Sequence, residues 1–388
     1  MIKGLSSNGD TGTIHIVLTN FCNLGCKGCY QPEEERSKQN QFKDNDILNE
    51  SNLIEIINLF NKFTNENKDI NLSFFGGEPL YRQQNIIKIL NWLAYNQLEP
   101  HKISIPTSGG KNQNLIYNIE PLIDLVSTKF PNTKLTISLS YDGVNNQELR
   151  NINPEAITES YQHIKELGIK YKNNEKAFYP EFISCLIPQV IDQNYFIDNY
   201  INVMNITGNI PNFRIPHLLD TDSNLDTWTF SVALDKFLWY ITAKDFITEN
   251  SEGYRTRYLL YLYKTDQLPK LFKDVIDLIF NPIRYENDFN WCQAGKSHFT
   301  ITSDGKHKND CEYLHTPALE LHSKQMEHCN NCEIKQWCNK PCLKSIEISE
   351  EQFLRHCTIR KILLNQIRKV LVPGTNNNTN NKLNKEIK

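Results

Sequence analysis

The sequence lacks the features that mark membrane, secreted or nucleic-acid-binding proteins. Its 388 residues carry 42 Lys and Arg against 45 Asp and Glu, so no charge excess points to nucleic acid or an anionic membrane. No apolar run approaches the roughly 20 residues of a membrane span. The first residues, MIKGLSSNGDTGTIHIVL, hold no signal-peptide core. We therefore expect a cytoplasmic protein that binds neither nucleic acid nor membrane.

Cysteine is abundant by contrast, and its positions are grouped. Of the 11 cysteines, three lie within eight residues, Cys185 stands alone, and seven lie between 292 and 357. In a reducing cytosol, thiols grouped in this way are more often metal ligands than disulfides. Cys185 falls in an expected strand and is interpreted as a small core residue.

The first half of the chain alternates between short apolar runs and helical periodicity. Expected strands lie at 13–19, 70–75, 103–105, 135–140, 182–187 and 213–215, with helices between them. This alternation predicts an α/β fold with a parallel sheet, either doubly wound or a barrel. Glycine-rich and polar turns follow the strands at 76–79, 107–110 and 141–143. In both architectures these carboxyl ends hold the ligand site.

The rest of the chain changes character twice. Residues 223–290 are rich in aromatic residues at helical spacing, most of them expected in a core and some as a possible lining of a substrate groove. From 291 the cysteines dominate, and the last residues are polar and rich in asparagine. We expect an α/β domain over 1–222, a helical bridge over 223–290, a small metal-held domain over 291–370 and a disordered tail over 371–388.

The first cysteine group has the spacing C-x3-C-x2-C and directly follows the first expected strand, at Cys22, Cys26 and Cys29. Three thiolates can hold three corners of a 4Fe–4S cubane and leave the fourth iron open, as a catalytic metal requires. The alternative is a zinc knuckle or unrelated thiols. A Gly-Gly-Glu-Pro strand end follows about 50 residues later.

Together these two motifs resemble the radical S-adenosylmethionine (SAM) enzymes. The resemblance covers about 13–220 and implies a partial (β/α)6 TIM-like barrel. In that family the open iron chelates the amino and carboxylate groups of SAM. One electron then cleaves the C–S bond, and the 5′-deoxyadenosyl radical abstracts hydrogen from the substrate. The resemblance also implies a flavodoxin- or ferredoxin-type electron donor.

The resemblance carries several SAM contacts onto this sequence. Gly76 and Gly77 allow close backbone approach to a ligand, and Glu78 places a carboxylate near the SAM ammonium. A helix that starts at Glu78, with proline at its first position, is compatible with this role. Arg150 matches an arginine that pairs with the SAM carboxylate, although a surface ion pair is the alternative. The full set of implied SAM contacts is Tyr30, Gly76, Gly77, Glu78, Ser140, Arg150 and Leu219.

The second cysteine group resembles the SPASM domain of radical SAM enzymes that modify peptides and proteins. The resemblance implies two auxiliary 4Fe–4S clusters, hence three clusters in all; a pair of structural zinc sites is the alternative. The first auxiliary cluster is assigned Cys292, Cys311 and Cys342, and the second Cys329, Cys332, Cys338 and Cys357. Because the first has three thiols for four corners, its fourth iron is open to substrate or closed by His307, Asp310, Glu312 or water. Two departures from the family pattern are an extra residue between Gly305 and Cys311 and Lys340-Pro341 in place of glycines.

These resemblances predict a maturase acting on a precursor peptide made by the ribosome, with a crosslinked, oxidised or epimerised product. Glu312 follows Cys311 where sulfatase-maturating members carry a general-base aspartate, so it is the candidate catalytic base. Sulfatase-like oxidation of a protein side chain, modification of a metabolite, and a non-catalytic electron carrier are the alternatives. About a dozen residues precede the first strand, so we expect no N-terminal leader-recognition domain. A separate protein would then recognise the leader, or the enzyme would bind its substrate directly.

Overall fold

The computed structural model describes residues 11–26, 29, 50–109, 113–141, 143–171, 179–185, 191–208, 210–214, 226–243, 251–280, 298–302, 307–308, 318–338, 347 and 349–371. The chain divides into two compact units, and each is described by itself. The first unit comprises Met1–Ile183 and Cys292–Glu320, and the second comprises Ser184–Trp291 and Leu321–Lys388. None of the described helices is long and apolar enough to cross a membrane. The three boundaries between the four segments expected from the sequence stay predictions.

The first unit is built on a parallel sheet whose strands follow one another in chain order. Strands β1 to β5 are neighbours in sequence order and run parallel, as the strand–helix alternation predicted. Strand β7 pairs parallel with the free side of β1, and β8 pairs antiparallel with β7. The bounds are β1 Thr11–Thr19, β2 Asp69–Gly76, β3 Lys102–Thr107, β4 Lys134–Ser140, β5 Tyr179–Cys185, β7 His298–Ile301 and β8 His307–Lys308. The expected α/β fold is confirmed.

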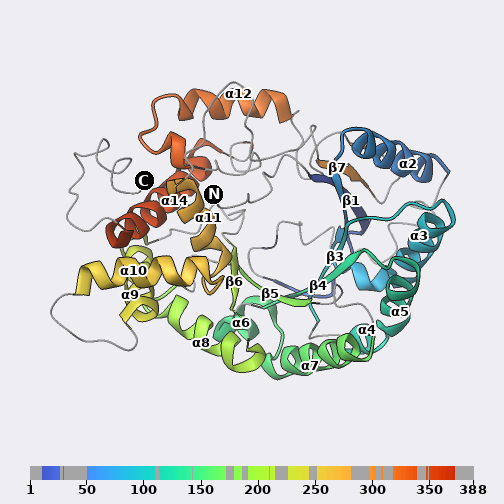
Figure 1. The fold of residues 1–388 in the computed structure, drawn as a ribbon, viewed down its shortest axis with the longest axis horizontal. Helices are drawn as coiled ribbons and strands as arrows, with labels where there is room; N and C mark the ends of the chain where they lie inside the picture. Colours follow the sequence, from blue (N-terminus) through green and yellow to red (C-terminus); the bar gives the residue numbers. More distant parts are fainter. Residues whose placement is uncertain are drawn as a thin grey trace. The chain divides into compact units, whose positions relative to one another are not determined.

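Helices connect the strands along one side of this sheet. In Figure 1, α2, α3, α5 and α7 lie along the outer side of the arc formed by β1 to β5. This one-sided arrangement is that of a partial barrel. The helical bounds are α2 Glu50–Asn65, η1 Pro79–Arg82, α3 Gln83–Tyr95, α4 Gln113–Tyr117, α5 Glu120–Lys129, η2 Gly143–Asn145, α6 Asn146–Arg150 and α7 Pro154–Lys170.

The two faces of the sheet differ in chemistry. Cα partners across a parallel sheet share a face, and one register row runs His15–Ser73–Ser104–Thr136 across β1 to β4. The alternate positions hold fully buried aliphatic and aromatic residues, namely Ile14, Ile16, Leu72, Phe74, Ile103, Ile105, Leu135 and Ile137. Apolar residues of the helices bury themselves against that second face, so the polar row faces away from the helices.

The second unit is mainly helical and is organised around an aromatic core. Its elements are α8 Tyr195–Thr207, β6 Asn212–Arg214, α9 Thr227–Ala243, α10 Ser251–Lys264, α11 Lys270–Phe280, α12 Ala318–Cys329 (whose first residues belong to the first unit), η4 Lys335–Trp337 and α14 Glu350–Leu371. The Phe196 ring lies 5.4–6.2 Å, centroid to centroid, from the rings of Phe213, Phe230, Phe237 and Phe272. The aromatic stretch also leaves Trp228, Trp239 and Tyr261 exposed.

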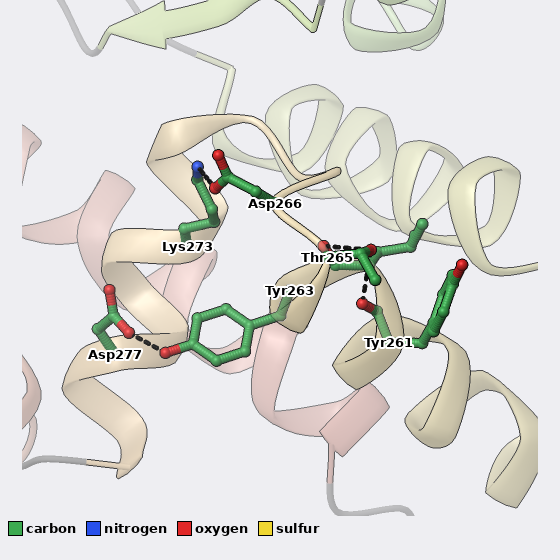
Figure 2. Close-up of polar contacts among 7 residues, drawn as sticks. Tyr261, Tyr263, Thr265, Asp266, Lys273 and Asp277 are labelled. Carbon is green, nitrogen blue, oxygen red and sulfur yellow. Dashed lines mark hydrogen bonds and ion pairs between the residues drawn. The ribbon is translucent and has the colours of Figure 1, made fainter. Parts of the chain in front are cut away.

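Polar contacts tie α10 to α11 across their short connection. The Tyr263 hydroxyl donates to the Asp277 carboxylate, and Lys273 forms an ion pair with Asp266 (Figure 2). The Thr265 hydroxyl donates to the Tyr261 carbonyl oxygen at 2.8 Å and closes the end of α10. Burial, followed by the bond to Asp277, raises the pKa of Tyr263, so the phenol stays protonated and keeps donating.

Candidate functional site

The first cysteine group lies in the loop that leaves the carboxyl end of β1. The Phe21 N–H donates to the Thr19 hydroxyl at 3.0 Å and turns the chain into this loop. Cys22, Cys26 and Cys29 are half-buried free thiols. Burial raises the pKa of Cys22 to about 12, the Leu24 N–H lowers it, and Glu78 and the other two thiols raise it further. The three sulfur atoms and the Glu78 carboxylate therefore share one neighbourhood.

The glycine pair after β2 lies directly against the start of this loop. The Gly77 N–H donates to the Thr19 carbonyl at 2.7 Å. Gly76 has a φ of +130°, and a Cβ on it would lie 2.1 Å from the Thr19 oxygen. A Cβ on Gly77 would lie 2.2 Å from the Phe21 oxygen. We expected the pair to approach a ligand, and the structure shows that it approaches the chain's own backbone at the exit of β1.

Glu78 is the centre of the strand-end network. Its carboxylate is 1% exposed and accepts from the Leu80 N–H at 3.2 Å, the Thr107 hydroxyl at 2.9 Å and the Ser108 N–H at 2.8 Å. It also caps η1 with proline in the first turn, as the compatible interpretation expected. Burial raises the pKa of Glu78, while the hydrogen bonds from Ser108, Leu80 and Thr107 oppose that rise.

The other sequence-predicted SAM contacts are partly described. Ser140 ends β4, and Arg150 ends the short helix α6 that follows; both side chains are half-buried. Tyr30, Leu219 and the candidate base Glu312 lie outside the described residues. The hydrogen-bonding partners Thr107 and Ser108 were not singled out from the sequence as site residues. The signal that could have found them was their position at the end of the neighbouring parallel strand.

Four cysteines of the second group are described, all in the second unit. Cys329 ends α12, Cys332 and Cys338 flank the turn that includes η4, and Cys357 lies on α14. The Cys332 N–H donates to the Cys329 carbonyl at 3.1 Å. Burial raises the pKa of Cys357 to about 12, and Cys338, Cys329 and Cys332 add to that rise. These four thiols therefore share a second neighbourhood.

The donor sets fit iron–sulfur clusters in their chemistry, because grouped thiols are the ligands that such clusters take. The seven described cysteines of the two groups are free thiols. Among the described residues, no three His, Cys, Asp or Glu side chains converge tightly enough to hold a single metal ion. Cys292, Cys311 and Cys342, assigned to the first auxiliary cluster, lie outside the described residues, as does Asp310. The division of thiols among three clusters stays a prediction.

Comparison with known proteins finds similarity to iron–sulfur and radical SAM proteins. A family model described as a 4Fe–4S single cluster domain matches residues 8–150. The radical SAM cyclopropyl synthase TigE of Paramaledivibacter caminithermalis is 24% identical over 371 residues, covering 89% of this chain and 71% of that protein. Over most of its length, the chain is therefore similar to a radical SAM enzyme. A crystal structure of Streptococcus suis SuiB bound to precursor peptide SuiA is also similar, with 14% identity, a TM-score of 0.49, and coverage of 87% of this chain and 73% of that chain.

Proposed function

We propose that this chain is a radical SAM maturase that modifies a ribosomally made peptide. The observation that carries the proposal is the buried Glu78 network beside the cysteine loop, at the carboxyl edge of the sheet. Parallel α/β sheets bind their ligands at that edge. When bound there, the cluster and SAM would supply the radical that abstracts hydrogen from substrate. The seven-cysteine pattern after residue 291 supports a peptide as the substrate class.

We assign the SAM-binding cluster to Cys22, Cys26 and Cys29, and two auxiliary clusters to the C-terminal cysteines as the SPASM pattern divides them. We propose that Glu312 accepts a proton from the substrate. A flavodoxin- or ferredoxin-type protein is the proposed electron donor. The similarity to a cyclopropyl synthase supports carbon–carbon bond formation as the product class. An epimerised or oxidised product is the competing outcome.

The cluster assignment is tested by replacing Cys22, Cys26 and Cys29 together with alanine. The triple variant, reconstituted anaerobically with iron and sulfide and supplied with SAM and reductant, should form no 5′-deoxyadenosine by chromatography. It should keep the iron of the C-terminal clusters. Cys185→Ala is the matched control and should cleave SAM at the wild-type rate. Normal cleavage by the triple variant would refute the assignment.

The substrate class is tested with the peptide encoded by a short reading frame next to the gene. Mass spectrometry should show the loss of two hydrogen atoms if a crosslink or ring forms. An unchanged mass in water, with one deuterium gained in heavy water, would show epimerisation instead. The peptide proposal fails if SAM cleavage is unaffected by the peptide and every recovered peptide is unmodified.

A further inference from the structure

The Glu78 carboxylate already accepts several hydrogen bonds from the chain itself. Its Oε1 accepts from the Leu80 N–H and the Thr107 hydroxyl, and its Oε2 accepts from the Ser108 N–H. An ionised carboxylate offers about four lone-pair positions. Three of them are therefore used by donors from the chain itself.

Burial closes the same carboxylate off from a ligand. Glu78 is 1% exposed, Thr107 3% and Ser108 8%. A SAM ammonium that bonded an oxygen now in use would have to displace one of the three donors and leave that donor buried without an acceptor. The free energy of such an unpaired donor opposes the exchange.

The bonds of Glu78 join three neighbouring strand ends. Its N–H donates to the Phe21 carbonyl at 2.9 Å, at the start of the cysteine loop after β1. Its carboxylate holds Thr107 and Ser108, at the end of β3. The Gly109 N–H in turn donates to the Thr107 hydroxyl at 3.2 Å. Glu78 itself follows β2, so the backbone and side chain of one residue together join the ends of β1, β2 and β3.

We propose that Glu78 is a positioning residue: its N–H holds the start of the cysteine loop, its carboxylate holds the Thr107–Gly109 turn, and the carboxylate does not bind the SAM ammonium. This inference rests on the proposed function, because it presumes that SAM binds at this strand end. It replaces the sequence-based expectation that the Glu78 carboxylate faces the ammonium. The isosteric change Glu78→Gln keeps the size of the side chain but turns an NH₂ group toward donors.

The deciding experiment compares two ligands on the full-length, cluster-reconstituted chain. The affinities of wild type and Glu78→Gln are measured by equilibrium dialysis for SAM and for a SAM analogue with hydrogen in place of the α-amino group. The clamp predicts that Glu78→Gln weakens both ligands by the same factor, about tenfold or more. A loss confined to SAM, with the analogue unaffected, would show a direct contact with the ammonium and overturn the proposal.

Two further variants keep the test decisive. Thr107→Val removes one donor while keeping the shape of the side chain, and should weaken both ligands equally but less than Glu78→Gln. If Glu78→Gln does not fold, Thr107→Val carries the same comparison between ligands. Glu99→Gln is the matched control, because Glu99 also accepts from a backbone N–H, that of Asn132 at 2.7 Å, but at an exposed loop. It should leave both affinities unchanged.

A second measurement separates this inference from the proposed function. Hydrogen exchange of either the Ser108 or the Leu80 amide should accelerate about tenfold or more in Glu78→Gln, because these amides bond different oxygens of Glu78 and glutamine keeps only one of the two. Unchanged protection would overturn the clamp whether or not SAM binds. If the wild-type chain binds neither ligand, the proposed function fails, and the exchange rates still decide whether Glu78 clamps the strand ends.

Discussion

Gly77→Ala should disable the site through a single methyl group. The added Cβ would lie 2.2 Å from the Phe21 carbonyl oxygen and 2.6 Å from that of Asn20. An ordinary carbon–oxygen contact is about 3.3 Å, so the backbone entering the cysteine loop must move by roughly 1 Å. Both obstructing atoms belong to the main chain, which cannot yield by a rotamer change. The displacement therefore falls on the segment that leads directly to Cys22.

The expected cost is large because catalysis depends on position. A misplacement of about 1 Å can reduce a rate by about 100-fold. We therefore expect Gly77→Ala to form 5′-deoxyadenosine about 100-fold more slowly than wild type under the same reductant. The assay follows the product by chromatography, together with iron content and melting temperature.

Gly208→Ala supplies the control for general destabilisation. Gly208 has a φ of +70° at the end of α8, and a Cβ on it would meet nothing within 4 Å. This substitution should cost about 1–2 kcal/mol of backbone strain and lower the melting temperature. It should leave SAM cleavage per folded molecule unchanged. If Gly77→Ala cleaves SAM at the wild-type rate with full iron content, the seating of the cysteine loop by the glycine pair is refuted.

Three further results are expected. Anaerobic reconstitution should load about 12 iron atoms per chain, that is three 4Fe–4S clusters, and saturation at one cluster with zinc in the remaining sites would contradict this. Phe196→Ala should lower the free energy of unfolding by about 3–5 kcal/mol because the ring contacts four buried phenylalanines. In urea titrations the exposed control Ile201→Ala on the same helix should cost far less, and equal losses would count against an aromatic core. Burial raises the pKa of Asp274 in the folded protein. The free energy of unfolding therefore falls as pH rises from the unfolded-state pKa of this carboxyl to its folded-state pKa. Asp274→Asn should therefore raise the melting temperature at pH 7, and a gain that persists unchanged below about pH 4 would contradict that origin.

The sheet could be predicted because each strand leaves a local signal. All six expected strands occur within a few residues of their predicted positions, since alternating or continuous apolar runs bounded by glycine and polar residues are readable along the chain. The buried faces of the helices could be predicted less exactly. In α2 the spacing of Leu53, Ile57, Phe60 and Phe63 predicts one apolar face. The structure buries Ile56 and Leu59 with Phe60 and Phe63, while Leu53 and Ile57 are half-buried. The apolar stripe of a packed helix is wide enough to allow such a shift.

Strand β7 could not be predicted from the local sequence. His298–Ile301 is four residues long, and its pairing partner β1 lies nearly 300 residues earlier in the chain. A four-residue run carries too little periodicity to distinguish a strand from a loop. Its place in the sheet depends on Ile14 and Ile16 of β1 offering a free edge, which is a tertiary property.

The role of Glu78 depends on the same kind of long-range information. The motif identified the residue and its place after a strand, but the donors that decide its role come from Thr107 and Ser108, about 30 residues later. The pairing of Ser73 with Ser104 sets the register of β2 and β3. Three residues beyond each partner lie Gly76 and Thr107, so the register brings the two strand ends level. A sequence motif can thus locate a functional carboxylate, whereas the neighbouring strand determines whether its oxygens remain available to a ligand.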